Sequence, residues 1–302
     1  MNLTHYEQRA LKEIEEWETA KPGLVIKTMD ALGRPVTVIM EKVPRPLRGT
    51  AERAVMGFME MLKDISYWTY SEKSIIKKGM NNGLDVSAVS HLAGQDLEKL
   101  DRLARRHFAS AKIIAALEGA GCGLGGLALI AADIPVLMGI IFRSIQQIGT
   151  CYGFPMQDPS MLPVVMGIYN AGSGESAAVK SAALADMQIA AATMAGKTAY
   201  LKMAAKTKTA MALRFMENSA GSLPSRIAKN ISKRKLGQVI PVVGAVIGAG
   251  FNYWLMSHTL TAAYMIFRKM HLERKQEAAP KRPAGNPAIE AVKRRFRLLG
   301  VR

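Results

Sequence analysis

Residues 111–152 read AKIIAALEGAGCGLGGLALIAADIPVLMGIIFRSIQQIGTCY. Five glycines lie within residues 119–126, and from Gly119 to Phe142 the only charged residue is Asp133. The glycines predict a helix that frays into a glycine-rich bend, followed by a second apolar helix. Asp133 is then the expected N-cap of the second helix, and Pro135 falls in its first turn, where a missing N–H costs little.

A second apolar segment runs from Gln238 to Phe267 without a charged residue. It is long enough to span a bilayer, but basic residues flank it on both sides and give no orientation. Pro241 and the glycines at 244, 248 and 250 predict a broken helix that forms a hairpin. Two arrangements stay open for this hairpin: it is buried in the protein core, or it inserts into a bilayer.

The chain as a whole is predicted to be all-α. Residues 1–270 form a multi-helix bundle with two central glycine-rich apolar helical hairpins, and residues 271–302 form a basic, flexible tail with a short amphipathic helix. Thr4 and Glu7 have the spacing of a capping box, so a helix is expected to begin there and end near residues 21–23. Residues 96–117 predict an amphipathic helix, and residues 36–39 are the best strand candidate.

Several segments in a fixed order resemble the EcsC family. The resemblance covers residues 4–268, and its segments are 116–120, 123–126, 132–135, 145–148 and 152–153, together with 6–17, 96–104 and 235–253. It implies an α-helical bacterial protein that associates with a membrane. The family brings no established biochemical activity and no catalytic residues that can be assigned here.

The distribution of charge is one-sided. The chain carries 41 basic and 24 acidic residues, a formal net charge of +17. Residues 1–186 are balanced, so all of the excess lies in residues 187–302. A basic half indicates a polyanionic partner, which is an anionic bilayer or nucleic acid. Aromatic residues are few near the basic tail, which disfavours binding to single-stranded nucleic acid.

Two basic segments are the candidate lipid-binding sites. One precedes the second apolar segment, and in the other, basic residues alternate with apolar ones, as in helices that lie in a membrane interface. The residues are Lys233, Arg234, Lys235, Lys293, Arg294, Arg295, Phe296 and Arg297.

The sequence contains no complete catalytic or cofactor motif. Residues 121–126 match G-x-G-x-x-G, but a helical pattern precedes them and no acidic residue follows at the required distance. The histidines lack metal-site spacing, so neither a metal nor a cofactor is expected. One polar site is a candidate, because lone polar groups in apolar helices need partners. Its residues are Asp133, Arg143, Gln146, Gln147 and Asn252.

These observations favour a non-enzymatic protein of the inner face of the cell membrane. Two cysteines and a charged N-terminal segment indicate the cytoplasm. The expected partner is an anionic membrane surface, with other membrane proteins as further partners and nucleic acid disfavoured. The alternatives are a membrane-inserted hairpin protein, a nucleic-acid binder, and a hydrolase or lipid-modifying enzyme with an unrecognised site. The sequence does not fix the oligomeric state.

Overall fold

The computed structural model describes residues 3–20, 53, 57, 70–124, 126–158, 161–173 and 243–278. Within these ranges every regular element is a helix, which confirms the all-α prediction. The elements are α1 (His5–Thr19), α4 (Glu72–Met80), α5 (Val89–Leu92), α6 (Leu97–Leu124), α7 (Gly126–Cys151), α8 (Leu162–Ser173) and α12 (Val243–Ala278). None of these helices combines the length and the apolar content needed to cross a bilayer.

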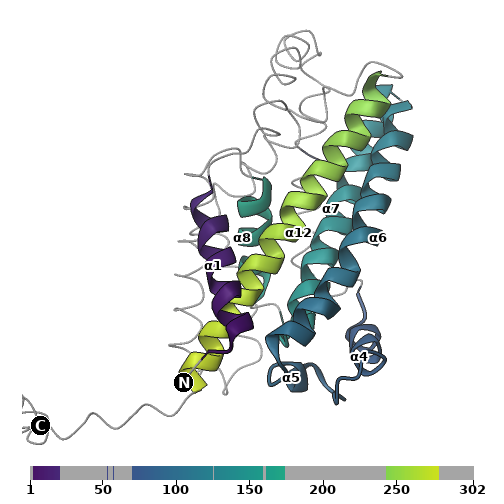
Figure 1. Ribbon diagram of the computed structural model, residues 1–302. Coiled ribbons are helices and arrows are strands. Elements are labelled where there is room, and N and C mark those ends of the chain that lie inside the picture. Colours follow the sequence, from purple (N-terminus) through teal and green to yellow (C-terminus); the bar gives the residue numbers. More distant parts are fainter. Residues whose placement is uncertain are drawn as a thin grey trace, which may run out of the picture.

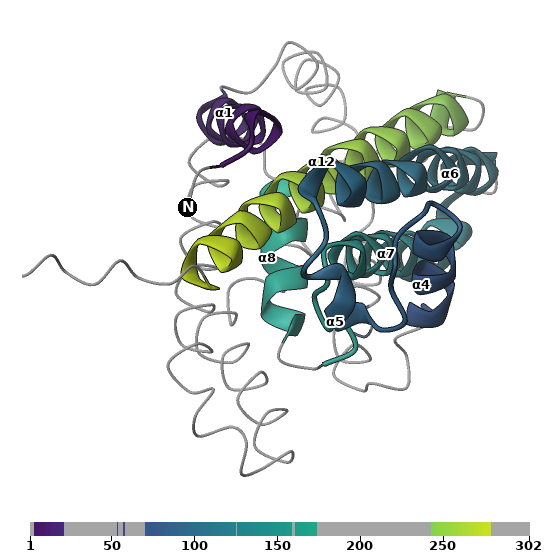
Figure 2. The same ribbon diagram turned by 60° about the horizontal axis from the view of Figure 1, so that its bottom comes forward.

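Three long helices form the centre of the bundle (Figure 1). α7 folds back against α6 directly after residue 125, and α12 packs along both of them. α12 runs antiparallel to α6, because Asp101 of α6 contacts Arg268 of α12 while Lys112 lies over the ring of Tyr253. α1 lies against α12 and α6, and α8 packs on α12 and α7 (Figure 2).

The local signals near the N-terminus predict α1 correctly. The Thr4 hydroxyl accepts a hydrogen bond from the Glu7 amide at 3.2 Å, and the Glu7 carboxylate accepts one from the Thr4 amide at 2.9 Å. This capping box satisfies two backbone donors that the helix itself leaves without partners. The helix ends at Thr19, just before the predicted end.

The prediction for the glycine-rich bend is wrong. α6 continues as a helix to Leu124, and α7 begins at Gly126, so the glycines at 119, 121 and 123 are helical. Asp133 therefore lies well inside α7 and is not its N-cap, and Pro135 is also interior to the helix. An interior proline removes one helical hydrogen bond at a cost of about 3 kcal/mol. Packing of α7 against α6 and α12 outweighs this local preference.

The prediction of a hairpin within the second apolar segment is wrong. α12 is one helix of 36 residues that includes the glycines at 244, 248 and 250. Each glycine weakens an isolated helix by about 1 kcal/mol, but α12 packs against α6, α7 and α8, and this tertiary contact stabilises it.

Three predictions fall outside the described residues. They are the strand at 36–39, the terminal amphipathic helix and the flexible tail beyond residue 278. The proposed boundary at residue 270 stays a prediction, although α12 continues past it to Ala278.

The turn after α7 depends on one glycine. Gly153 has a φ of +77°, which disfavours any residue with a Cβ. A Cβ on Gly153 would also lie 2.4 Å from the backbone nitrogen of Ala93, which follows α5. The backbone of this turn therefore approaches α5 more closely than any side chain would allow.

The substitution Gly153→Ala is expected to destabilise the protein strongly. Gly83→Ala is the matched control, because Gly83 has a similar φ of +76° and an added Cβ there meets nothing within 4 Å. The control should lose about 1 kcal/mol from backbone strain alone. Gly153→Ala should lose about 3 kcal/mol or more, measured by urea unfolding. Equal losses in the two variants would show that the contact with Ala93 contributes nothing.

Candidate functional site

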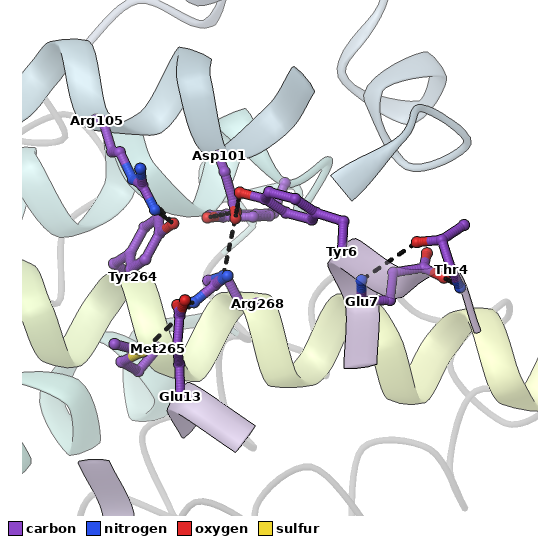
Figure 3. Close-up of polar contacts among 10 residues, drawn as sticks. Thr4, Tyr6, Glu7, Glu13, Asp101, Arg105, Tyr264, Met265 and Arg268 are labelled. Atoms are coloured by element: carbon purple, nitrogen blue, oxygen red, sulfur yellow. Dashed lines mark hydrogen bonds and ion pairs between the residues drawn. The ribbon is translucent and has the colours of Figure 1, made fainter. Parts of the chain in front are cut away.

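A buried carboxylate, Asp101 of α6, is the centre of a polar cluster that joins several helices (Figure 3). The Tyr6 hydroxyl from α1 donates to Oδ2 at 2.7 Å, and the Tyr152 hydroxyl from the turn after α7 donates to Oδ1 at 2.6 Å. The Arg268 Nε from α12 lies 3.0 Å from Oδ2. Asp101 therefore contacts side chains from three other segments of the chain.

Arg268 carries the network onward to further residues. Its Nη1 donates to Glu13 of α1 at 2.8 Å, and its guanidinium lies 4.6 Å from the ring centroid of Tyr264. The Tyr264 hydroxyl in turn accepts hydrogen bonds from Arg105 at 2.8 and 3.1 Å. Arg268 is 1% exposed, so these partners, and not water, stabilise its charge.

The electrostatics keep the tyrosines of the cluster as hydrogen-bond donors. Burial, reinforced by the neighbouring Asp101, raises the pKa of Tyr6 to about 12 and raises the pKa of Tyr152 well above its usual value. Burial alone would lower the pKa of Arg268, but the Asp101 charge and the Glu13 hydrogen bond raise it overall. At neutral pH the hydroxyls of Tyr6 and Tyr152 therefore both donate to Asp101. Because Asp101 and Tyr152 are fully buried, its chemistry fits the joining of helices and not contact with a substrate.

A second set of contacts joins the end of α12 to the turn after α7. Arg274 donates to the carbonyl oxygens of Tyr152 and Gly153 at 2.8 and 3.3 Å. It also lies 3.1 Å from Nδ1 of His271, which is buried. Burial, together with the Arg274 charge, lowers the pKa of His271 to about 4. Nearby, Lys275 donates to Glu7 of α1.

Five large apolar side chains of α6, α7 and α12 are exposed in the half of the bundle where α6 ends. Ile113, Ile114 and Leu117 of α6 are 58%, 51% and 68% exposed. Val136 of α7 and Tyr253 of α12 are 53% and 48% exposed. These five residues lie 7 to 11 residues from the last residue of α6 or from the first residue of α7 or α12. We call these five residues the apolar end.

A lysine borders the apolar end. Lys112 Nζ lies 5.8 Å from the ring centroid of Phe108 and 5.9 Å from that of Tyr253. These contacts place Tyr253 of α12 next to the α6 turn that carries Ile113. A lysine and a partly exposed tyrosine at the margin of apolar groups are typical of surfaces that meet a bilayer interface.

The residues predicted to form a polar site lie in different environments. Arg143 is exposed and Gln147 is partly buried, whereas Gln146 and Asn252 are buried. The side chain of Asp133 lies outside the described part, so the shared polar site stays a prediction. All eight candidate lipid-binding residues, at 233–235 and 293–297, also lie outside it. Within the described ranges, no group of three His, Cys, Asp or Glu residues could hold a metal ion.

The Asp101 cluster was not predicted from the sequence. Tyr6 and Asp101 are 95 residues apart, and Asp101 and Tyr152 are 51 residues apart, so no local spacing connects them. One signal was available: Tyr6, Asp101, Tyr152 and Arg268 all fall within the stretch that resembles the EcsC family.

Comparisons with known proteins agree with this resemblance. A family model described as the EcsC protein family matches residues 8–272. The chain belongs to the EcsC family. It is 23% identical over 277 residues to "Uncharacterized protein YdbA" of Bacillus subtilis, which covers 88% of this chain and 93% of that protein. It is 24% identical over 216 residues to "Protein EcsC" of the same organism, covering 70% and 79%. No solved structure matches this EcsC family member.

Removing the buried charge of Asp101 is expected to destabilise the protein. Asp101→Asn keeps the size of the side chain but leaves Arg268 without its buried carboxylate partner. Breaking one side of such a pair costs about 3 kcal/mol or more. Asp96→Asn is the matched control, because its contact with Lys99 at 3.9 Å is exposed and should be worth less than about 1 kcal/mol. Urea unfolding measures the free energy of unfolding of both variants. If Asp101→Asn loses no more stability than the control, the cluster does not support the fold.

Stability should fall as the pH is lowered from about 6.5 toward about 4. His271 has a folded-state pKa of about 4, below the 6.5 of an exposed histidine, so the unfolded chain binds more protons in this window. The contribution of His271 to the free energy of unfolding is complete above pH 6.5. As the pH falls toward 4, this contribution decreases by up to about 1.4 kcal/mol per pH unit. Urea unfolding at several pH values should show a shallower slope for His271→Gln. The exposed His5→Gln should keep the wild-type slope, and identical slopes in all three proteins would rule out His271 as the cause.

Proposed function

We propose that this EcsC family protein is a non-enzymatic, peripheral membrane-binding protein of the inner face of an anionic membrane. The observation that carries the proposal is the apolar end: the consecutive helices α6 and α7 and the distant helix α12 all expose large apolar side chains. A contiguous group of this kind on a protein surface typically marks a contact with a membrane or a partner.

The distribution of charge supports a bilayer as the partner. Residues 119–132 and 243–257 contain no charged residue, and they include the end of α6 and the beginnings of α7 and α12, while Glu118 and Asp133 border the first range. Charged groups are expensive in the hydrocarbon region, so this end suits shallow burial there. Full burial of an Ile or Leu side chain contributes about 1.5–3 kcal/mol, and these side chains already hide part of their surface.

In the sequence, a basic segment precedes the beginning of α12. Lys235 precedes Val243, the first residue of α12, by eight residues. Basic residues near apolar groups give attraction to anionic lipid of about 1 kcal/mol each.

The substitution Leu117→Asp tests this proposal. It places a charge on the most exposed of the five apolar side chains, so vesicle affinity should fall by about 100-fold, or about 3 kcal/mol. Met80→Asp is the matched control, because Met80 is 56% exposed on α4, which packs on α7 away from the apolar end. Flotation with vesicles of phosphatidylcholine and phosphatidylglycerol measures the binding.

Three results would overturn the proposal. The first is that the wild-type protein floats with no vesicle. The second is that Leu117→Asp and Met80→Asp lose affinity equally. The third is that the protein binds duplex DNA with a steep salt dependence and shows no dependence on lipid composition. Circular dichroism and urea unfolding of both variants report whether the fold is kept.

A further inference from the structure

The ammonium group of Lys112 is held between two aromatic rings, one from α6 and one from α12. Its Nζ lies 5.8 Å from the ring centroid of Phe108, one helical turn earlier in α6, and 5.9 Å from that of Tyr253 in α12. Both distances fall within the range of about 6 Å over which the face of a ring attracts a cation. Two helices therefore fix the position of this charge.

The hydrogen-bond donors of Lys112 have no acceptor among the described residues. An ammonium group can donate three hydrogen bonds, and the ring faces attract its charge without using those donors in conventional hydrogen bonds. Arg105, seven residues earlier on α6, provides a comparison. Its guanidinium lies 5.3 Å from the ring centroid of Tyr264, but its nitrogens also donate to the Tyr264 hydroxyl. Lys112 keeps its donors for an acceptor from outside the described part of the chain.

The charge of Lys112 also differs from that of the lysines in the second half of α12. Lys269 contacts Glu18 at 2.7 Å, and Lys275 contacts Glu7. Each of these two lysines is therefore neutralised by a carboxylate of α1. Within the described ranges Lys112 contacts no carboxylate, so its positive charge is left for another partner.

Lys112 adjoins the apolar end directly. Ile113, which is 58% exposed, follows it in the sequence, and Tyr253, whose ring contacts its ammonium group, is one of the five apolar-end residues. An anion bound by Lys112 would lie beside exposed apolar side chains, so the two contacts need no separation along the bundle. A phosphate that is attached to acyl chains, as in a lipid, offers both kinds of contact at once.

We propose that Lys112 binds the phosphate of an anionic lipid headgroup while the neighbouring apolar side chains contact the acyl chains. The proposal rests on the membrane association proposed above and names the residue that recognises the lipid. In phosphatidylcholine the choline cation compensates the phosphate, whereas in phosphatidylglycerol the phosphate charge is uncompensated. Because two rings already restrict the Lys112 side chain, binding costs less conformational entropy than it would for a freely rotating lysine.

Vesicle flotation of the full-length chain tests the proposal. The measured quantity is the affinity for vesicles of phosphatidylcholine and phosphatidylglycerol divided by the affinity for vesicles of phosphatidylcholine alone. Lys112→Gln should lower this ratio about fivefold, since one basic residue near an anionic surface contributes about 1 kcal/mol. Lys112→Arg keeps the charge and can keep the ring contacts, so it should hold the ratio within about twofold of the wild type.

Lys99→Gln is the matched control on the same helix. The contact of Lys99 with Asp96 at 3.9 Å is exposed and therefore weak. Lys99 lies 13 residues from Lys112, or about 20 Å along the helix axis, which exceeds the screening length of about 8 Å at physiological ionic strength. This control should change the ratio by less than about twofold. Circular dichroism of every variant reports whether the fold is kept.

A double-mutant cycle tests whether Tyr253 positions Lys112. Tyr253→Leu removes the ring but keeps an apolar side chain, so the affinity ratio should fall about threefold as the ammonium group loses one of its two ring contacts. When Lys112→Gln is already present, the same substitution should leave the ratio unchanged, because no ammonium group remains to be positioned. Equal effects of Tyr253→Leu in both backgrounds would contradict this role of the ring.

The outcomes separate this inference from the proposed function. If wild-type protein binds no vesicle, the proposed function fails. If it binds, but either shows no preference for anionic lipid or keeps its preference in Lys112→Gln, membrane association stands and the assignment to Lys112 is overturned. An equal loss in Lys99→Gln would also overturn the assignment, because total charge and not position would then govern binding.

Discussion

The contact between Asp101 and Arg268 sets the constraint on which the bundle depends. Both side chains are almost completely removed from water, and burying them would cost several kcal/mol each without partners. The partners come from α1, α12 and the turn after α7, so each polar contact of Asp101 crosses between elements. Removing any one element leaves a buried charge short of a donor. The assembly of these segments is therefore coupled, which favours a single arrangement over alternative helix pairings.

The same contact fixes how α6 and α12 lie against each other. With Asp101 opposite Arg268 and Arg105 opposite Tyr264, antiparallel packing brings Lys112 to Tyr253. This register leaves the two ends of the bundle chemically different. One end is closed by polar contacts between α1, α12 and the turn after α7, while the other presents apolar side chains to the surroundings. The contact between Asp101 and Arg268 therefore sets the register that brings Tyr253 of α12 beside the α6 turn that carries Ile113.

Only the locally encoded parts of this structure could be predicted from the sequence. The capping box at Thr4 and Glu7 needs two residues three positions apart, so its signal was present and the helix followed. The glycine-rich bend and the second hairpin were wrong, because glycine preferences are worth about 1 kcal/mol each and packing along α6, α7 and α12 exceeds them. The Asp101 cluster could not be predicted, since its partners are 51 and 95 residues away and become neighbours only in the folded chain.

Net charge illustrates the same limit in electrostatic terms. The basic half of the chain indicated a polyanion, but charge counted along a sequence does not say which groups face outward. In the described part of that half, Arg268, Lys269 and Lys275 contact carboxylates of α1 and α6, so their charge is largely neutralised within the protein. Arg102 and Arg106 belong to the balanced half, yet they are exposed on the helix that carries Ile113 and Leu117. A binding surface depends on which charged side chains are left without strong partners inside the protein. A half of the chain with no net charge can therefore still present a basic surface.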